Sequence, residues 1–446
     1  MTTANAELNI GGLIDAIEPG KLYRSAIEEI AESVEPIIAE NETYRKARVF
    51  ERLLIPDRVI RFRVEWVNDD GEVELNFGWR IEHCNAMGPY KGGLRFHPTV
   101  DEDTLHFLAY EQCFKNALTG QPIGGGKGGS NFDPKGRSDN EVMRFCQAFM
   151  RELHRHIGPH VDVPAGDMGV GGRELGFLYG QYMKITKQRD GVLSGKPIGL
   201  GGLLGRTEAT GYGAVTFVEE MMKHRSEKIE GKRIAISGAG NVALYAAELA
   251  HQKDAKVVSL SDSGGALICE KGFTEEQLKE LVEYKEVQRG RLKDWSGDGC
   301  SFYSEDKPWS HVDHDVALPC ATQHEIEEDD AKRILDRGCT FIAEGANMPC
   351  THGARVLFHD SGATFGPGKA ANAGGVATSC FEMHQNAAHD AWSKERSLEK
   401  LREVMVQIHE QCVEHAPKEN GIVNYGAGAD RAGFVKLADA IVAMGV

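Results

Sequence analysis

The fold is decided by one stretch of the sequence, residues 234–243, which read IAISGAGNVA. Its apolar start predicts a strand, and residues 244–250 have the apolar spacing of a helix. A Gly-x-Gly-x-x-Ala turn between them offers free backbone N–H groups and the positive end of a helix dipole to a pyrophosphate. The pattern alone also fits an ordinary glycine turn, but a second strand predicted at Lys256–Leu260 favours a dinucleotide site at Gly238 and Gly240.

The end of that second strand leaves the choice of dinucleotide open. An acidic side chain there, Asp262, would hydrogen-bond the ribose 2′-hydroxyl of NAD, whereas NADP needs cations and hydroxyls around its 2′-phosphate. The flanking Ser261 and Ser263 carry hydroxyls, and Lys285, Arg289 and Arg291 follow downstream. From the residues alone, these cations fit an ordinary solvated basic surface equally well.

The chain has 446 residues, which is enough for two domains because single cores stop growing near about 250–300 residues. Residues 191–205 are rich in glycine and nearly uncharged, which indicates a flexible boundary rather than packed structure. We therefore expect an N-terminal α/β domain in residues 1–200. Residues 201–375 should form a dinucleotide-binding domain with a doubly wound parallel sheet.

The first domain is predicted to combine helices with a hairpin. Apolar residues alternate along 59–66 and again along 73–81, and the turn Asn68–Gly71 lies between them. Capping-box patterns at Thr99–Glu102 and Ser138–Glu141 predict the starts of two helices. Residues 376–446 are expected to complete this domain as three helices with no strand between them, at 376–389, 398–415 and 430–444.

Composition excludes several classes of partner. The net charge of -16 would repel nucleic acids and anionic membrane surfaces, and no apolar run approaches the length of a membrane span. The ten cysteines lie between Cys84 and Cys412 without a Cys-x-x-Cys pair, so we expect reduced thiols, no disulfides and no metal site. These features predict a soluble, cytoplasmic enzyme that acts on small molecules.

Two lysines and one aspartate lie in unusually glycine-rich surroundings. Residues 124–129 read GGGKGG, which is no phosphate-binding P-loop because no serine or threonine follows the lysine. We interpret this segment as a loop in which the glycines let a substrate approach Lys127 closely. A lysine desolvated there would have a lowered pKa and become usable in proton transfer. Lys91 lies in a similar setting, and Asp167 is either an acid–base group or a turn former.

Gln112 and Lys115 are three residues apart, so they lie on one face of a predicted helix. Together with Lys91 and Lys127 they would suit a substrate that carries two carboxylates. Each lysine taken alone also fits a solvated surface charge.

At this point the chain resembles the glutamate dehydrogenases, with the same motif order over nearly its whole length. The resemblance rests on 88–98 (GPYKGGLRFHP), 124–129 (GGGKGG), 164–174 (PAGDMGVGGRE), 206–213 (RTEATGYG), 237–243 (SGAGNVA), 343–349 (AEGANMP) and 372–379 (NAGGVATS). It implies a substrate-binding and oligomerisation domain, a Rossmann-like cofactor domain and a homohexamer. The implied reaction interconverts L-glutamate with 2-oxoglutarate and ammonium by hydride exchange with NADP rather than NAD, as in ammonia assimilation.

The resemblance also implies residue roles. Lys91 and Ser379 would bind the side-chain carboxylate of glutamate, and Lys115 and Gln112 the α-carboxylate. Lys127 would polarise the 2-oxo group and activate water, while Asp167 moves protons to and from the amine. The remaining implied contacts are Gly166, Arg206 and Val376 for the substrate, and Thr210, Gly238, Gly240, Asn241, Val242, Ser261, Ser263, Lys285, Asn347 and Asn372 for the cofactor.

One departure and two alternatives accompany this interpretation. Cys380 stands where the family has a small residue, which would reshape the pocket beside the side-chain carboxylate. Leucine-, valine- or phenylalanine-type dehydrogenases share the scaffold, but they carry an apolar residue at the position of Lys91. A non-catalytic dinucleotide-binding regulator is the other alternative, and the intact Lys127 and Asp167 argue against it.

Overall fold

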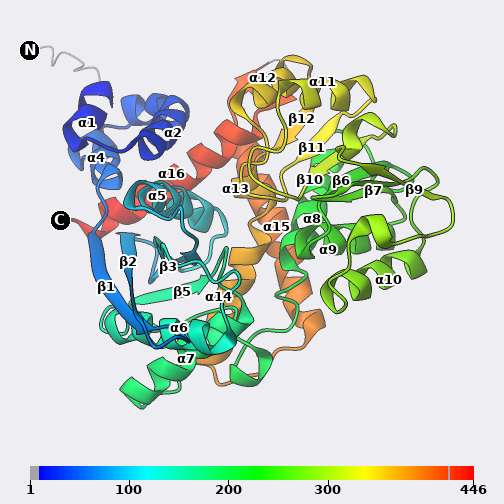
Figure 1. Cartoon of the computed structure of the whole chain (residues 1–446). Coiled ribbons are helices and arrows are strands. Elements are labelled where there is room, and N and C mark those ends of the chain that lie inside the picture. Colours follow the sequence, from blue (N-terminus) through cyan, green and yellow to red (C-terminus); the bar gives the residue numbers. More distant parts are fainter. Residues whose placement is uncertain (1–9, 420–421) are drawn as a thin grey trace, which may run out of the picture. The chain divides into compact units, whose positions relative to one another are not determined.

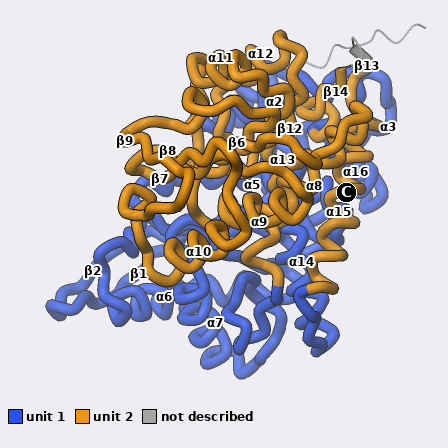
Figure 2. Tube along the Cα trace, turned by 90° about the vertical axis from the view of Figure 1, so that its right-hand side faces the viewer, with its two compact units in different colours: residues 1–204, 376–394, 430–446 blue, residues 205–375, 395–429 orange. Residues whose placement is uncertain are grey.

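The computed structural model describes residues 10–419 and 422–446, which form two compact units (Figures 1 and 2). Unit 1 comprises the described residues up to Leu204 together with Val376–Lys394 and Asp430–Val446, and unit 2 comprises Gly205–Gly375 and Glu395–Ala429. No helix in the described ranges is both long and apolar enough to cross a membrane.

Unit 1 is built on a mixed five-stranded sheet with the strand order β1-β2-β4-β3-β5. Helix α5 packs on β2 and β4 beneath α2, whereas α6 packs on β1 and α7, and Figure 1 shows α5 and α6 on opposite sides of the sheet. The elements are α1 (Ile10–Ile17), α2 (Lys21–Glu40), α3 (Glu42–Lys46), α4 (Val49–Leu54), β1 (Arg58–Val67), β2 (Val73–Cys84), β3 (Tyr90–Phe96), α5 (Glu102–Leu118), β4 (Gly125–Ser130), α6 (Asp139–Leu153), β5 (Asp162–Gly166), α7 (Gly172–Thr186) and η1 (Ile198–Leu200).

The predicted hairpin is confirmed, with β1 antiparallel to β2 from Arg58 opposite Glu82 to Val67 opposite Val73. One of the two capping boxes is also confirmed: the Ser138 hydroxyl accepts a hydrogen bond from Glu141 N, and the Glu141 carboxylate accepts one from Ser138 N. The other is wrong, because α5 is capped by Asp101, whose carboxylate accepts from Thr104 N at 2.9 Å. Thr99 instead interacts with the ring of His97.

Unit 2 contains a seven-stranded sheet with the order β12-β11-β10-β6-β7-β8-β9. The first five strands in this order are parallel, and β8 and β9 add an antiparallel edge. Helices α8 and α9 lie on one side of the sheet and α11 and α12 on the other (Figure 1). The elements are α8 (Ala209–His224), β6 (Arg233–Ser237), α9 (Asn241–Gln252), β7 (Lys256–Asp262), β8 (Gly265–Cys269), α10 (Glu275–Glu286), η2 (Leu292–Asp294), β9 (Cys300–Ser304), η3 (Pro308–Ser310), β10 (Val316–Pro319), α11 (Glu328–Asp336), β11 (Phe341–Ala343), α12 (His352–Asp360), β12 (Thr364–Gly366) and α13 (Gly368–Ala371).

The C-terminal part of the chain is divided between the units, contrary to the expectation that all of 376–446 belongs with the first domain. Helix α15 (Lys394–His415) lies almost entirely in unit 2, because its buried side chains pack on α8: the rings of Phe217 and His409 are 5.7 Å apart. The short strands β13 (Lys418–Glu419) and β14 (Ile422–Val423) follow α15, so the prediction that no strand separates these helices is wrong. Helices α14 (Gly374–Ala387) and α16 (Tyr425–Met444) each begin in unit 2 and continue in unit 1.

The glycine-rich segment 191–205 is packed in its first half, so the prediction of a flexible boundary is wrong there. Leu193, Ser194 and Lys196 are buried. The Lys196 ammonium forms an ion pair of 2.7 Å with Glu382 on α14, and both side chains are almost completely buried. Glu382 also accepts a hydrogen bond from Gly195 N at 2.9 Å. A buried ion pair with satisfied partners therefore holds this segment to α14.

Replacing Glu382 by glutamine should lower the free energy of unfolding by about 2–3 kcal/mol, because the variant breaks a buried ion pair by removing one partner. Chemical denaturation of the variant and the wild type measures this difference. Glu283→Gln makes the same change on α10 and should alter stability by less than about 0.5 kcal/mol. Equal stability of Glu382→Gln and the wild type would show that the pair contributes nothing to holding this segment.

Candidate active site

The catalytic lysine predicted from the glycine-rich segment lies on a strand rather than in a loop. Residues Gly125–Ser130 form β4, between β2 and β3 in the sheet of unit 1. The glycines are required by the close packing of neighbouring strands, since a Cβ atom on Gly92 would lie 1.6 Å from Gly126 O and one on Gly129 would lie 2.2 Å from Arg95 O. Lys127 is thus the one long side chain on a buried strand.

Lys127 and Asp167 form an ion pair, with 2.7 Å between Lys127 Nζ and Asp167 Oδ2. Asp167 directly follows β5. Strand β3 pairs with β5 on one side and with β4, which carries Lys127, on the other, and this pairing brings the two side chains together. Arg95 on β3 donates from Nε to the same carboxylate oxygen at 3.1 Å. A Cβ atom on Gly93 would lie 2.7 Å from the Cβ atom of Asp167, so this glycine leaves room for the aspartate.

The pKa values of Lys127 and Asp167 suit proton transfer. Burial lowers the pKa of Lys127, and the charge of Asp167 opposes that shift without cancelling it, as expected from the sequence. Burial raises the pKa of Asp167, but Lys127 and Arg95 lower it by more, to about 2. Asp167 is therefore ionised at neutral pH, beside a lysine that gives up its proton more readily than a solvated one.

Lys91 lies on β3 and is almost fully buried, with 1% of its surface exposed. Its ammonium donates to Ser194 Oγ at 2.7 Å, and Ser194 N donates to Pro164 O at 2.9 Å. The charge of Lys91 also lowers the pKa of Cys380, although burial of that thiol has the larger effect and raises its pKa to about 12. Lys91 thus lies close to the part of α14 that carries Ser379, which is also buried.

Helix α5 connects to the same region through Asn116. Gln112 Nε2 donates to Asn116 Oδ1 at 2.6 Å, and Asn116 Nδ2 donates to the backbone carbonyl of Lys91 at 3.1 Å. Lys115 is partly buried on this helix. The predicted substrate residues Lys91, Gln112, Lys115, Lys127, Gly166, Asp167, Val376 and Ser379 all belong to unit 1, whereas Arg206 belongs to unit 2.

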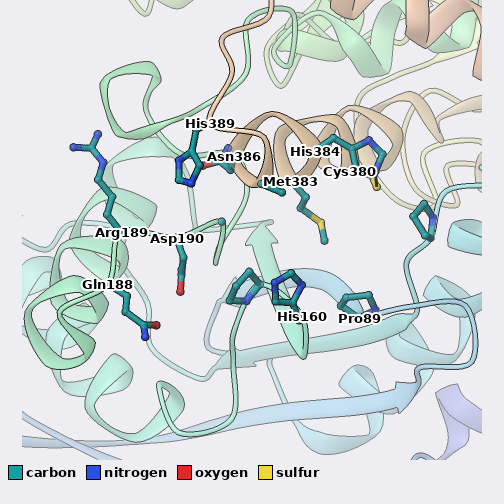
Figure 3. Close-up of a pocket in the computed structure, with 14 residues that line it drawn as sticks. Pro89, His160, Gln188, Arg189, Asp190, Cys380, Met383, His384, Asn386 and His389 are labelled. Atoms are coloured by element: carbon teal, nitrogen blue, oxygen red, sulfur yellow. Dashed lines mark hydrogen bonds between the residues drawn. The ribbon is translucent and has the colours of Figure 1, made fainter.

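A pocket of about 690 Å³ opens beside this region (Figure 3). Figure 3 shows Cys380, Met383 and His384 on α14, opposite Pro89 and His160. Cys380 and His384 both line this pocket, and Cys380 Sγ lies 3.6 Å from His384 Nε2. The described residues contain no cluster of three or more His, Cys, Asp or Glu side chains arranged for a metal ion.

The glycine turn of unit 2 has the predicted form. Gly238 has a φ of +89°, which L side chains rarely adopt, and Gly240 precedes the first turn of α9 without any side-chain cap. The backbone N–H groups at the start of α9 therefore have no side-chain acceptor, as a bound pyrophosphate requires. Asn241 and Val242 form this first turn.

The carboxylate of Asp262, at the end of β7, forms hydrogen bonds and an ion pair within unit 2. Asp262 accepts hydrogen bonds from Gly264 N and Leu292 N, both at 2.9 Å, and pairs with the Lys285 ammonium at 3.1 Å. Burial raises its pKa, but these contacts together lower it. The Ser261 hydroxyl accepts from Gly238 N at 2.9 Å and so braces the glycine turn.

Ser263 and four other predicted residues lie at three further places in unit 2. The Ser263 hydroxyl accepts from the exposed Arg291 guanidinium at 2.6 Å. Asn372 donates to Ala346 O at 2.8 Å and to Asn347 Oδ1 at 3.1 Å. Thr210 and Arg206 lie together, because a Cβ atom on Gly375 would be 2.7 Å from Thr210 Oγ1 and 3.6 Å from Arg206 Nη1.

Two residues of the site were missed from the sequence. Arg95 contacts Asp167 and lies four residues after Lys91 within the motif 88–98, so membership of that motif was a usable signal. Ser194 gave no signal, because its contact with Lys91 depends on the packing of a segment that the sequence indicated as flexible.

A Rossmann-like unit with an uncapped helix start, together with a largely buried lysine–aspartate pair on a second unit, is typical of a dinucleotide-dependent oxidoreductase. Residues 201–445 match the family described as Glutamate/Leucine/Phenylalanine/Valine dehydrogenase, and residues 56–184 match the dimerisation domain of the same family. The chain belongs to this family.

Relatives and solved structures agree over nearly the whole chain. The chain is 50% identical to the NADP-specific glutamate dehydrogenase of Escherichia coli (strain K12), over 95% of both chains. It is 49% identical to the NAD(P)-specific glutamate dehydrogenase of Xylanibacter ruminicola, over 95% of this chain and 96% of that one. The crystal structure of Plasmodium falciparum glutamate dehydrogenase superposes with a TM-score of 0.95 at 45% identity, covering 98% of this chain and 94% of that chain.

Proposed function

We propose that this protein is an NADP-dependent glutamate dehydrogenase that interconverts L-glutamate with 2-oxoglutarate and ammonium. The proposal is carried by the buried Lys91 in the same unit as the Lys127–Asp167 pair. A buried ammonium beside Ser194 and α14 suits a substrate with a second carboxylate, because opposite charges attract strongly where water is excluded. The same ammonium would disfavour the apolar side chains of leucine, valine or phenylalanine.

In this function unit 1 binds the substrate and unit 2 the cofactor. Lys91 and Ser379 hold the side-chain carboxylate, and Lys115 and Gln112 hold the α-carboxylate. Gly166, Val376 and Arg206 are the further substrate residues of this proposal. The start of α9 at Asn241 and Val242 and the glycines 238 and 240 hold the pyrophosphate, while Thr210, Asn347 and Asn372 contact the rest of the cofactor.

The chemistry of the bound substrate would be carried by Lys127 and Asp167. NADP, when bound, accepts or donates the hydride at the substrate α-carbon. Lys127 polarises the 2-oxo group, stabilises the carbinolamine and activates water, which its lowered pKa favours. Asp167, ionised by the influence of Lys127 and Arg95, accepts protons from the amine and returns them.

A homohexamer in the cytoplasm is part of this proposal. Strand β1 is an edge strand of the unit 1 sheet, and the adjacent β2 exposes Val73, Leu75 and Phe77 on one face, with 69%, 62% and 45% of their surfaces exposed. An exposed edge with an apolar face of this kind is a contact surface for another chain. Light scattering of the purified protein gives the number of subunits.

The assay that tests the function compares the oxidation of NADPH and NADH with 2-oxoglutarate plus ammonium. The same cofactors are then offered with the apolar 2-oxo acids that correspond to leucine and phenylalanine. A preference for the apolar substrates would make the protein a dehydrogenase of the leucine or phenylalanine type. No oxidation with any substrate would leave only a non-catalytic dinucleotide-binding protein.

Cofactor preference should depend on Lys285. Because Asp262 is engaged by Lys285 and two backbone N–H groups, the cations Lys285 and Arg291 with the Ser263 hydroxyl are expected to hold a 2′-phosphate. NADPH should therefore be preferred over NADH in kcat/KM. Lys285→Glu should reduce that preference about tenfold or more, since it places a carboxylate beside the phosphate.

The matched control is Lys293→Glu, which makes the same charge change at an exposed residue of η2. It should leave the ratio of the two kcat/KM values within about twofold of wild type if only nearby charges matter. A wild-type enzyme that prefers NADH would instead mean that Asp262 binds the ribose hydroxyls.

A further inference from the structure

Two cysteines of unit 2 lie directly opposite each other at the antiparallel edge of its sheet. In the pairing of β8 with β9, Cys269 is the partner of Cys300. Both thiols are free in the structure. Cys269 is buried, whereas Cys300 is partly exposed on the edge strand β9.

The hydrogen bonds around these strands show which kind of cross-strand pair this is. Glu305 N donates to Gly264 O, so the adjacent pair of Gly265 with Ser304 is a non-hydrogen-bonded pair. Pair types alternate along an antiparallel ladder, and counting four positions onward makes Cys269 and Cys300 a non-hydrogen-bonded pair as well. In such a pair the two residues do not bond to each other through their backbones. Consistent with this, Cys300 N donates to Gly297 O, and Cys269 O accepts from Gly272 N.

At a non-hydrogen-bonded position the two Cα atoms are only about 4.5 Å apart, within the range of about 4.4–6.8 Å that disulfides require. The thiols also interact: burial raises the pKa of Cys300, and the neighbouring Cys269 thiol raises it further. The strand register therefore places the two cysteines at a spacing that a disulfide can bridge.

We propose that Cys269 and Cys300 are a thiol–disulfide modification site, oxidised reversibly by a small-molecule disulfide such as glutathione disulfide. The Cys300 thiolate attacks the glutathione disulfide, forming a mixed disulfide and releasing one glutathione. Cys269 then attacks the Cys300 sulfur and releases the second glutathione. Two thiols of the protein are oxidised, one external disulfide is reduced, and the two protons end on the two glutathione thiols.

The disulfide would close a segment that matters for the proposed cofactor site. Residues 270–299 lie between the two cysteines and contain α10 and η2, with Lys285 and Arg291. Lys285 pairs with Asp262 at the end of β7, and Arg291 contacts Ser263. This consequence rests on the proposed function, whereas the disulfide itself does not.

The test incubates the full-length protein with glutathione disulfide and measures its mass without reductant. We expect the loss of two hydrogen atoms and a proteolytic peptide that joins Cys269 to Cys300, both reversed by dithiothreitol. The rate should rise with pH, because the raised pKa of Cys300 limits the thiolate fraction at neutral pH. Cys269→Ser should stop at the mixed disulfide, with one glutathione retained on Cys300.

The control Cys339→Ser removes another thiol of unit 2 and should oxidise like the wild type. An unchanged mass, or a cross-link between other cysteines, would overturn the proposal. For the cofactor site, oxidation should change the KM for NADPH at least about threefold in the wild type but not in Cys300→Ser. If the fully cross-linked enzyme has glutamate dehydrogenase activity with an unchanged KM for NADPH, the proposed effect of the disulfide on the cofactor site is overturned. The disulfide and the proposed function would both stand.

Discussion

Replacing Lys91 by leucine should lower kcat/KM for glutamate by about 10²–10⁴, corresponding to roughly 3–5 kcal/mol. The ammonium of Lys91 is buried on β3 and contacts Ser194, so a carboxylate bound there would interact with a charge that water hardly screens. Removing the ammonium leaves the glutamate side chain as an unpaired buried charge. The measurement is kcat/KM for oxidative deamination at one pH and saturating cofactor.

Norleucine is the matched control substrate, because it has an unbranched side chain without the carboxylate. Lys91→Leu should leave its kcat/KM unchanged or raise it, since the variant replaces a charged group near the apolar substrate side chain by an apolar one. The ratio of the two substrates therefore separates specificity from general damage. An equal proportional loss for both would mean that Lys91 serves catalysis or folding, and the assignment of a dicarboxylate pocket would have to be withdrawn.

Lys127→Ala should lower kcat at least about 10²-fold, the range expected for a group that transfers protons. The ammonium lies 2.7 Å from Asp167, and burial lowers its pKa, which prepares it for this role. The exposed Lys135 of the same unit offers the control: Lys135→Ala should retain wild-type turnover. Near-wild-type turnover by a correctly folded Lys127→Ala enzyme would refute the proposed mechanism.

Asp167→Asn tests the other member of the pair and should reduce kcat by a similar factor, because the amide keeps the shape but accepts no proton. The variant also removes the charge that raises the pKa of Lys127, so that pKa should fall further below its usual value. The pH dependence of the residual activity reports this change. A basic limb of the profile that shifts toward higher pH would contradict the electrostatic coupling seen between the two residues.

Local sequence patterns predicted the structure correctly wherever neighbouring residues alone determine the conformation. The glycine turn at Gly238, the hairpin around Asn68–Gly71 and the capping box at Ser138 depend on a few adjacent residues, and all are present in the structure. The pairing of Cys269 with Cys300 depends on strand register, which no local pattern revealed.

The sequence by itself therefore determined the two-unit α/β organisation and the glycine turn at Gly238. Only the tertiary structure decided that Lys127 lies on a strand, because the glycines of β4 are required by contacts with strands distant in sequence. Packing likewise decided that α15 joins unit 2 and that Arg95 contacts Asp167. The physical reason is common to these cases: each depends on contacts between residues far apart in the chain, which local propensity and spacing do not encode.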